Sequence, residues 1–384
     1  MEATRGDGVR WVVGALRGGG CVFAEEEAAV ILEAAGGDGG ELERLVRERV
    51  AGRPLEHLVG WAAFAGLRVV VEAGVFVPRR RTELLVREAV REAPDGAVVV
   101  DLCCGSGAIG AAIAAYGEGR IRLTTDADGD TVFEAVPAGG ERGRGGAVGP
   151  ARDGEAGDAG GGGADGERGG GADGGPGRGG FGAVDTDGEG EWGGFGVVDG
   201  DGEGGRGGFE VVAADVDGAA VASARRNLGA GRVFQGDLFG ALPVGLRGRV
   251  DVLVVNAPYV PSAAIATMPA EARLHEAGIA LDGGGDGLDV QRRIVAGARE
   301  WLSPGGRLLI ETSEDQAPLT SALFEAAGLA PRVVRDESLD ATVVVGHAGA
   351  RAPQRECGTT APGHQGARCS RRDGKPERTS RRAD

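Results

Sequence analysis

From residue 97 onward, the chain alternates short apolar runs with segments that have helical patterning. The run at 97–102 is almost continuously apolar, which is typical of a strand buried on both faces of a parallel sheet. A glycine turn and an apolar helix at 108–116 follow it. Further strands are expected at 209–214, 232–235, 250–255, 307–312 and 341–345, and further helices at 219–228, 288–302 and 318–327. This alternation predicts an α/β protein with a doubly wound sheet.

The first 60 residues predict a small helical domain. Three glutamates open the segment at 25–35, where negative charge favours a helix N-terminus. Leucine and valine recur at helical spacing over 42–50. Residues 61–71 and 74–77 are rich in β-branched and aromatic residues and predict a hairpin with its turn at 72–74. With a helix at 84–90, they form a connecting segment, 61–93, before a sheet domain at 94–348.

A glycine-rich segment interrupts the sheet domain where its second strand is due. Residues 137–208 hold 33 of the 76 glycines. Such a composition cannot bury enough apolar surface to offset the loss of chain entropy, so we expect a disordered insert at about 117–208. Its acidic repeats (Asp185, Asp187, Glu189) lack the bidentate glutamate of a calcium loop, and no metal site is predicted.

Two segments compete for the place of the second strand. One is 121–125, which is followed by Asp126, and the other is 209–215. We favour 209–215 because a well-patterned helix follows it directly. Asp126 is instead followed by Ala-Asp-Gly-Asp and no helix.

Composition excludes several classes of protein. No apolar run reaches about 18 residues, so no membrane span is expected, and the charged N-terminus does not resemble a secretory signal. The five cysteines contain no C-x-x-C pair, which argues against a zinc knuckle or a disulfide framework. We therefore expect a soluble cytoplasmic protein.

The charge is unevenly distributed along the chain. The net charge is −16, although the Arg-rich tail at 349–384 has nine basic and four acidic residues. An acidic body does not suggest a nucleic-acid groove, which needs a basic face. Contact with nucleic acid is expected at most through the tail, which is otherwise interpreted as a disordered, solvated end.

The turn between the first sheet strand and its helix has the form of a nucleotide-binding turn. It comprises Asp101 and Leu102 followed by Cys103, Cys104, Gly105, Ser106 and Gly107. Glycines let the backbone approach a ligand closely, and the helix N-terminus offers free N–H groups. The turn is neither a dinucleotide G-x-G-x-x-G nor a P-loop, and a purely structural tight turn is the alternative. Two later strand ends add Asp215, placed to accept ribose hydroxyls, and Asp237 with Leu238, placed to flank an adenine.

A second polar motif, Asn256-Ala257-Pro258-Tyr259, ends the strand at 250–255. In an open α/β sheet, ligands bind at this carboxyl edge. The side-chain oxygen of Asn256 and a neighbouring backbone carbonyl could accept both N–H groups of a planar nitrogen, while Tyr259 packs on the planar group. An asparagine that merely caps a turn is the alternative interpretation.

These motifs occur in an ordered series. Residues 54–345 without the insert resemble the protein-(glutamine-N5) methyltransferases, the HemK/PrmC group, and the matching segments are 54–60, 77–79, 82–86, 101–107, 256–259, 281–284, 286–289 and 303–306. The resemblance implies a Rossmann-like methyltransferase sheet that uses S-adenosylmethionine, and an N-terminal helical domain (1–60) that docks the protein substrate.

The resemblance also implies roles for the residues of the two motifs. The turn 101–107, Asp215, Asp237, Leu238 and Asn256 would bind the cofactor. Asn256, Ala257, Pro258 and Tyr259 would hold the amide of a glutamine exposed on the substrate protein.

The sequence departs from the family pattern at two places. The usual Asn-Pro-Pro-Tyr is Asn-Ala-Pro-Tyr here, and the usual Arg-Pro after the hairpin is Arg79-Arg80. Ala257 keeps its carbonyl and loses only the rigidity of proline. The chain thus resembles a side branch whose substrate is not established, with a release factor as first candidate and a ribosomal protein as second. The alternatives are methylation of adenine N6 in nucleic acid and a non-catalytic binding module.

Overall fold

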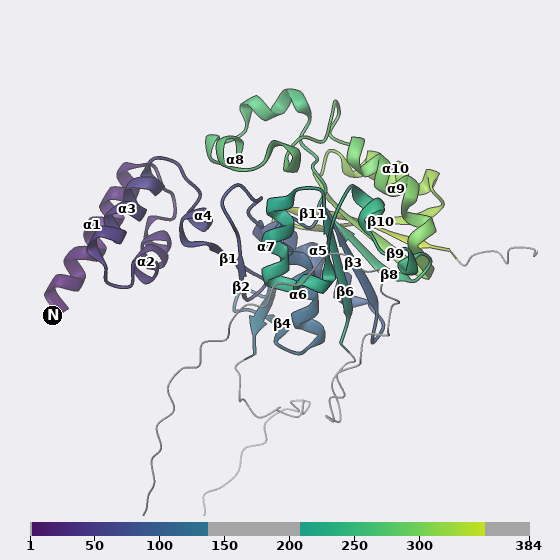
Figure 1. Ribbon diagram of the computed structural model, residues 1–384, viewed down its shortest axis with the longest axis horizontal. Helices are drawn as coiled ribbons and strands as arrows, with labels where there is room; N and C mark the ends of the chain where they lie inside the picture. Colours follow the sequence, from purple (N-terminus) through teal and green to yellow (C-terminus); the bar gives the residue numbers. More distant parts are fainter. Residues whose placement is uncertain (1, 137–207, 350–384) are drawn as a thin grey trace, which may run out of the picture.

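The computed structural model describes residues 2–136 and 208–349. Figure 1 shows a group of N-terminal helices beside a twisted sheet that carries helices on both faces. A short hairpin connects the two parts.

The N-terminal part contains four helices, α1 (Glu2–Gly18), α2 (Ala24–Ala35), α3 (Gly39–Val50) and α4 (Leu55–Val59). Val12, Leu16, Ile31 and Leu45 are fully buried in a cluster that belongs to these helices alone. The predicted helices are therefore present, and they fold around their own small core.

The hairpin joins β1 (Trp61–Phe64) to β2 (Leu67–Val70) in antiparallel register. The turn predicted at 72–74 is wrong, because the chain reverses at Ala65 and Gly66, with φ of 48° and 73°. A two-residue turn with positive φ at both central positions matches the twist of a hairpin. Residues 74–77 form no strand of the hairpin, although Gly74 makes a single bridge to Glu276.

The central sheet has seven strands in the order β10-β11-β9-β8-β3-β6-β7. Their bounds are β3 (Val98–Leu102), β6 (Glu210–Asp215), β7 (Val233–Gln235), β8 (Val250–Val255), β9 (Leu302–Thr312), β10 (Leu329–Asp336) and β11 (Ala341–Ala348). The five strands from β9 to β7 run parallel, and β11 and β10 are antiparallel additions. This is the predicted doubly wound α/β sheet, with β10 as a strand that the sequence did not predict.

Helices cover the two faces of this sheet. One face packs against α5 (Glu83–Arg91), α6 (Ala108–Gly117) and α7 (Gly218–Leu228), and the other against α9 (Asp289–Trp301) and α10 (Ala317–Ala326). Alternate residues of β3 separate the two cores, since Val99 lies with α6 whereas Val98 and Val100 lie with α9.

The segment at 209–215 is the second parallel strand, as predicted, because β6 pairs directly with β3. The rival segment forms β4 (Ile121–Thr125), which pairs only with β5 (Thr131–Ala135) in a separate hairpin. The predicted start of the insert at 117 is therefore wrong. Buried Ile121 and Phe133 anchor this hairpin, and Asp126 closes its turn by accepting N–H bonds from Asp128 and Asp130.

The disorder predicted for the rest of the insert and for the tail concerns residues 137–207 and 350–384, which lie outside the described residues.

A short irregular segment after β8 crosses the carboxyl edge of the sheet. It holds η5 (Ser262–Thr267), α8 (Ala270–His275) and η6 (Gly278–Ala280). Its end bridges to Gly74 beyond the hairpin, where the Ala277 N–H donates to the Gly74 carbonyl. This segment, residues 262–281, is called the α8 segment below, and it forms one wall of the cavity described next.

Candidate active site

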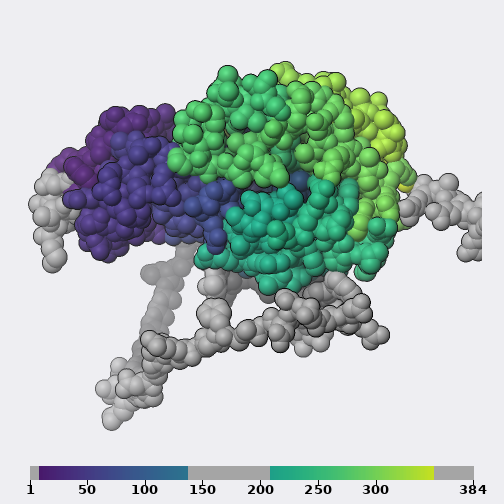
Figure 2. Space-filling model, turned by 45° about the horizontal axis from the view of Figure 1, so that its top comes forward, coloured from purple at the N-terminus to yellow at the C-terminus, as the bar shows by residue number. Residues whose placement is uncertain are grey.

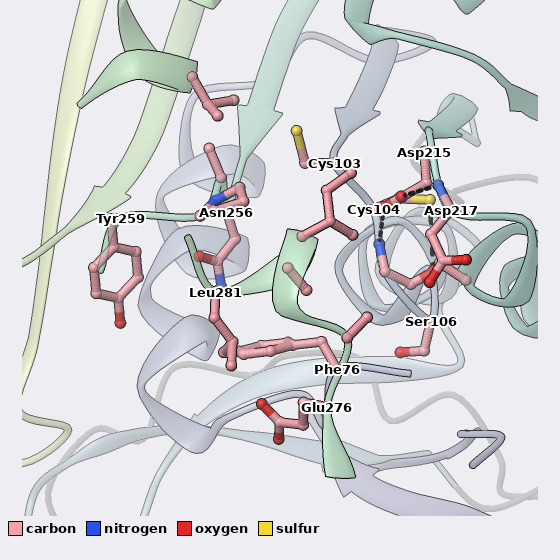
Figure 3. Close-up of a pocket in the computed structure, with 18 of the residues that line it drawn as sticks. Phe76, Cys103, Cys104, Ser106, Asp215, Asp217, Asn256, Tyr259, Glu276 and Leu281 are labelled. Atoms are coloured by element: carbon pink, nitrogen blue, oxygen red, sulfur yellow. Dashed lines mark hydrogen bonds between the residues drawn. The ribbon is translucent and has the colours of Figure 1, made fainter. Parts of the chain in front are cut away.

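A cavity of about 570 Å³ lies at the carboxyl ends of β3, β6, β7 and β8. Figure 2 shows the molecule hollowed between the green atoms of the α8 segment and the teal atoms that follow residue 208. In the close-up of Figure 3, Asp215 and Asp217 lie on one side of the cavity, and Asn256 and Tyr259 lie on the other. The cavity therefore has two distinct polar ends.

The turn after β3 forms the floor of the first end. Cys103, Gly105 and Gly107 have positive φ, at 61°, 53° and 73°, so the backbone reverses tightly here. The Cys104 N–H donates to the Ala214 carbonyl, which ties the turn to β6. At Gly107 a Cβ atom would lie 2.9 Å from Cβ of Ala224, so α7 can pack this closely only against glycine.

Asp101 supports the turn from below. It is fully buried, and its Oδ2 accepts the Gly110 N–H of α6 at 2.9 Å. Burial, with a smaller contribution from the negative charge of Asp215, raises the pKa of Asp101 to about 7, although the bond from the Gly110 N–H acts to lower it. Asp101 and Gly107 are not part of the cavity lining, whereas the other predicted residues are: Cys103, Cys104, Gly105, Ser106, Asp215, Asp237, Leu238, Asn256, Ala257, Pro258 and Tyr259.

The two cysteine side chains pack as small apolar groups. Burial raises the pKa of the Cys103 and Cys104 thiols, and the negative charges of Asp101 and Asp215 add to the shift. Both thiols are therefore protonated at neutral pH, so they do not act as nucleophiles.

Asp215 provides the main acceptor at the first end. Its two oxygens accept the Gly105 N–H at 2.8 Å and the Asp217 N–H at 2.9 Å. These bonds fix the carboxylate while each oxygen keeps lone-pair capacity for a ligand hydroxyl. Burial raises the pKa of Asp215, and the two backbone bonds oppose this effect.

Two further residues complete this end. Asp237 pairs with Arg293 of α9 at 2.5 Å. Asp217, which the sequence did not single out, lines the cavity and caps α7 by accepting the Ala219 N–H.

The second end is built by the residues that follow β8. The Nδ2 of Asn256 donates to Oγ1 of Thr82 at 3.3 Å. No described residue donates to Oδ1 of Asn256 or to the carbonyl of Ala257, which leaves two acceptors for a ligand. The backbone is held in place further along, because Nε2 of Gln316 donates to the Tyr259 carbonyl at 3.0 Å.

Apolar side chains from connecting segments close the cavity between its two ends. Phe76, Met268, Ile279 and Leu281 belong to this wall. Glu276, buried beside Phe76, forms an ion pair with Arg79. Leu281 and Arg79 lie in segments that resemble the family but were given no role, and the other four residues carry no motif, so the sequence analysis did not find them.

No family model matches the chain. A release factor glutamine methyltransferase of Mycolicibacterium smegmatis is 30% identical over 288 residues, which cover 74% of this chain and 71% of that protein. The chain belongs to the protein glutamine methyltransferase family. A release factor glutamine methyltransferase of Geobacter sulfurreducens is 29% identical to this chain over 288 residues, which cover 74% of this chain and 69% of that protein. A ribosomal protein uL3 glutamine methyltransferase of Burkholderia pseudomallei is 40% identical over 114 residues, or 28% of this chain and 37% of that protein.

Membership of the protein glutamine methyltransferases makes this chain an S-adenosylmethionine-dependent enzyme that methylates glutamine in a protein. The first end of the cavity suits that cofactor: Asp215 retains acceptor capacity for ribose hydroxyls, and Gly105 leaves open space above the turn. No cluster of metal-ligating side chains occurs among residues 2–136 and 208–349. Within the same residues, no helix is long and apolar enough to cross a membrane.

Proposed function

We propose that this chain methylates the side-chain nitrogen N5 of a glutamine in a peptide chain release factor, with a ribosomal protein as the second candidate substrate. The observation that carries the proposal is the pair of acceptors at the second end of the cavity. Oδ1 of Asn256 and the carbonyl of Ala257 belong to consecutive residues and are free of bonds from described residues. A primary amide has two N–H groups in one plane, and it matches such a pair.

The cofactor would lie at the opposite end. The turn 103–106, Asp215, Asp237 and Leu238 all line the cavity there and would hold its nucleoside and amino-acid parts. When bound, S-adenosylmethionine supplies an electrophilic methyl group. Asp101 and Gly107 would act indirectly, by holding the turn and α7 in place.

Amide nitrogen is a poor nucleophile because its lone pair is delocalised, so positioning must supply most of the rate. The two acceptors would fix the glutamine amide in the plane that presents nitrogen to the methyl group, and Tyr259 would pack on that plane. Good positioning contributes about 7–11 kcal/mol to a barrier in favourable cases. The apolar wall would exclude water from the reacting atoms.

The names of the relatives and the arrangement of the fold support this choice of substrate. Both long matches are named for release factors, and the shorter one is named for ribosomal protein uL3. The helices α1–α4 lie beside the cavity-bearing domain and would dock the substrate protein, so that only a loop with the glutamine enters the cavity.

The experiment offers the purified chain a deuterated-methyl cofactor together with a release factor, protein uL3, or nucleic acid. Mass spectrometry of the digested substrates should place the label on a single glutamine side chain of the release factor. Label on uL3 alone would replace the first substrate by the second. Label on adenine, or cofactor binding without transfer to any protein, would contradict the proposal.

A further inference from the structure

A buried series of polar groups, Asn256, Thr82 and Glu311, begins at the wall of the cavity, which Asn256 and Thr82 both line. Nδ2 of Asn256 donates to the hydroxyl of Thr82 at 3.3 Å, and the carboxyl group of Glu311 lies close enough to that hydroxyl for the contact to lower its pKa. Thr82 and Glu311 are each only 2% exposed. The resemblance to the family assigned no role to either side chain.

Three separate elements bring this chain of groups together. Asn256 follows β8, and Glu311 lies on β9, where the register that pairs Val255 with Ile310 places the two residues side by side. Thr82 ends the 3-10 turn η1 (Arg80–Thr82), just before α5. Its hydroxyl makes no capping bond to α5, so the side chain is available for the contact with Asn256.

The hydrogen bonds that connect Asn256, Thr82 and Glu311 run in a fixed direction. An ionised carboxylate can only accept, so the single hydroxyl hydrogen of Thr82 must point to Glu311. The Thr82 oxygen can then only accept from Asn256, which requires that the NH₂ group of the Asn256 amide faces Thr82. The amide oxygen of Asn256 is thereby turned away from Thr82, and no described residue donates to it.

We propose that Thr82, oriented by Glu311, is the positioning residue that holds the oxygen of Asn256 towards the substrate amide. The inference rests on the proposed function, since only a substrate that donates N–H bonds needs an acceptor there. The terminal torsion of asparagine is broad, so without the Thr82 contact the amide can turn over. Its NH₂ group would then face the N–H groups of the substrate and repel them.

The direction of these hydrogen bonds depends on the charge state of Glu311. Burial raises the pKa of Glu311 to about 7, while Thr82 and Arg81 act to lower it. Arg81 of η1 and Tyr259 after β8 are the ionisable groups that act on Glu311. Once protonated, Glu311 can donate to the oxygen of Thr82. The Thr82 hydroxyl can then donate to Oδ1 of Asn256 when the amide turns over. Methyl transfer should therefore fall as pH drops through about 7.

The first test compares Thr82→Val with Thr82→Ser in single-turnover methyl transfer at saturating cofactor. Valine keeps the branched shape and removes the hydroxyl, so the rate should fall at least about tenfold while cofactor affinity stays within about twofold. Serine restores the hydroxyl and should stay within about threefold of the wild type. A Thr82→Val variant at the wild-type rate, or a Thr82→Ser variant as slow as Thr82→Val, would overturn the inference.

A double-mutant cycle separates positioning from packing. On the Asn256→Ala background, Thr82→Val should change the residual rate by less than about twofold, because Thr82 acts only through Asn256. If Thr82 had a purely structural role, the rate losses of the two single variants would instead multiply in the double variant.

A second readout needs no substrate. In ¹⁵N spectra, the side-chain amide signal of Asn256 should shift with a midpoint near pH 7, and Thr82→Val and Glu311→Gln should each abolish that shift. If the wild type transfers no methyl group but the signal still follows pH in this way, the proposed function fails and the contact stands. If the wild type transfers methyl groups and the signal ignores both substitutions, the inference alone fails.

Discussion

Two glycines of the same turn, Gly105 and Gly107, serve different purposes. Both have positive φ. A Cβ atom at Gly105 would meet nothing within 4 Å, whereas one at Gly107 would press on Cβ of Ala224 and on Leu228. Gly105 therefore keeps space for a ligand, and Gly107 permits the close packing of α7 on the turn.

This difference predicts that a glycine-to-alanine substitution acts mainly on stability at Gly107 and mainly on cofactor binding at Gly105. Gly107→Ala should lower the free energy of unfolding by about 2–4 kcal/mol, since backbone strain adds to overpacking. Gly105→Ala carries only the strain, about 1 kcal/mol, but should weaken cofactor binding about tenfold by filling the cavity floor. Urea unfolding and calorimetric titration of the cofactor measure the two quantities. Equal losses of stability in both variants would contradict the assignment.

Single residues also show how far the sequence predicts the site. Asp215, Asn256 and Ala257 were found because each stands at or just after the end of an apolar strand, where parallel sheets bind ligands. The contact between Asn256 and Thr82 could not be found in this way, because 174 positions separate the residues and the tertiary fold alone unites them.

At the scale of elements, ion pairs hold the α8 segment over the cavity. Glu276 pairs with Arg79, which follows the hairpin in the sequence, and Glu271 pairs with Arg49 of α3 at 3.2 Å. Arg49 also bonds Glu27 of α2, so the N-terminal helices are connected to one wall of the cavity. Glu276 is buried, which makes its pairing with Arg79 the more important of the two.

We expect Arg79→Met to loosen this segment. The methionine keeps the apolar stem but leaves Glu276 buried without its partner. Backbone amides at 270–277 should exchange with deuterium about tenfold faster, while those of β3 are unchanged. Arg68→Met is the matched control, because it removes an exposed pair with Glu33. If both variants exchange alike, the Arg79 pair does not hold the segment.

The elements that the sequence failed to predict share a physical cause. β10 is an edge strand with alternating exposure and a proline at 331, so it lacks the apolar run that identified β3 and β8. The helix α8 has only six residues, which is too short to show a helical period. The turn of the first hairpin lies at Ala65-Gly66, where alanine in a left-handed conformation gives no signal in composition.

At the scale of the whole molecule, two different parts of the sheet edge would bind the two reactants. The turns after β3, β6 and β7 would hold the cofactor, and the residues after β8 would hold the glutamine. The insert enters between β5 and β6, beyond the amino end of β6, and the Asp215 site lies at the other end of that strand. An interrupted chain can thus keep both ends of the site intact, because long loops cost little closure entropy.

This division makes one measurement decisive, the effect of Asn256→Ala on methyl transfer and on cofactor affinity in the same preparation. The account predicts a loss of at least about a hundredfold in single-turnover rate, with the cofactor dissociation constant changed by less than about threefold. Loss of both quantities together, or of neither, would contradict the placement of the substrate amide at Asn256 and Ala257.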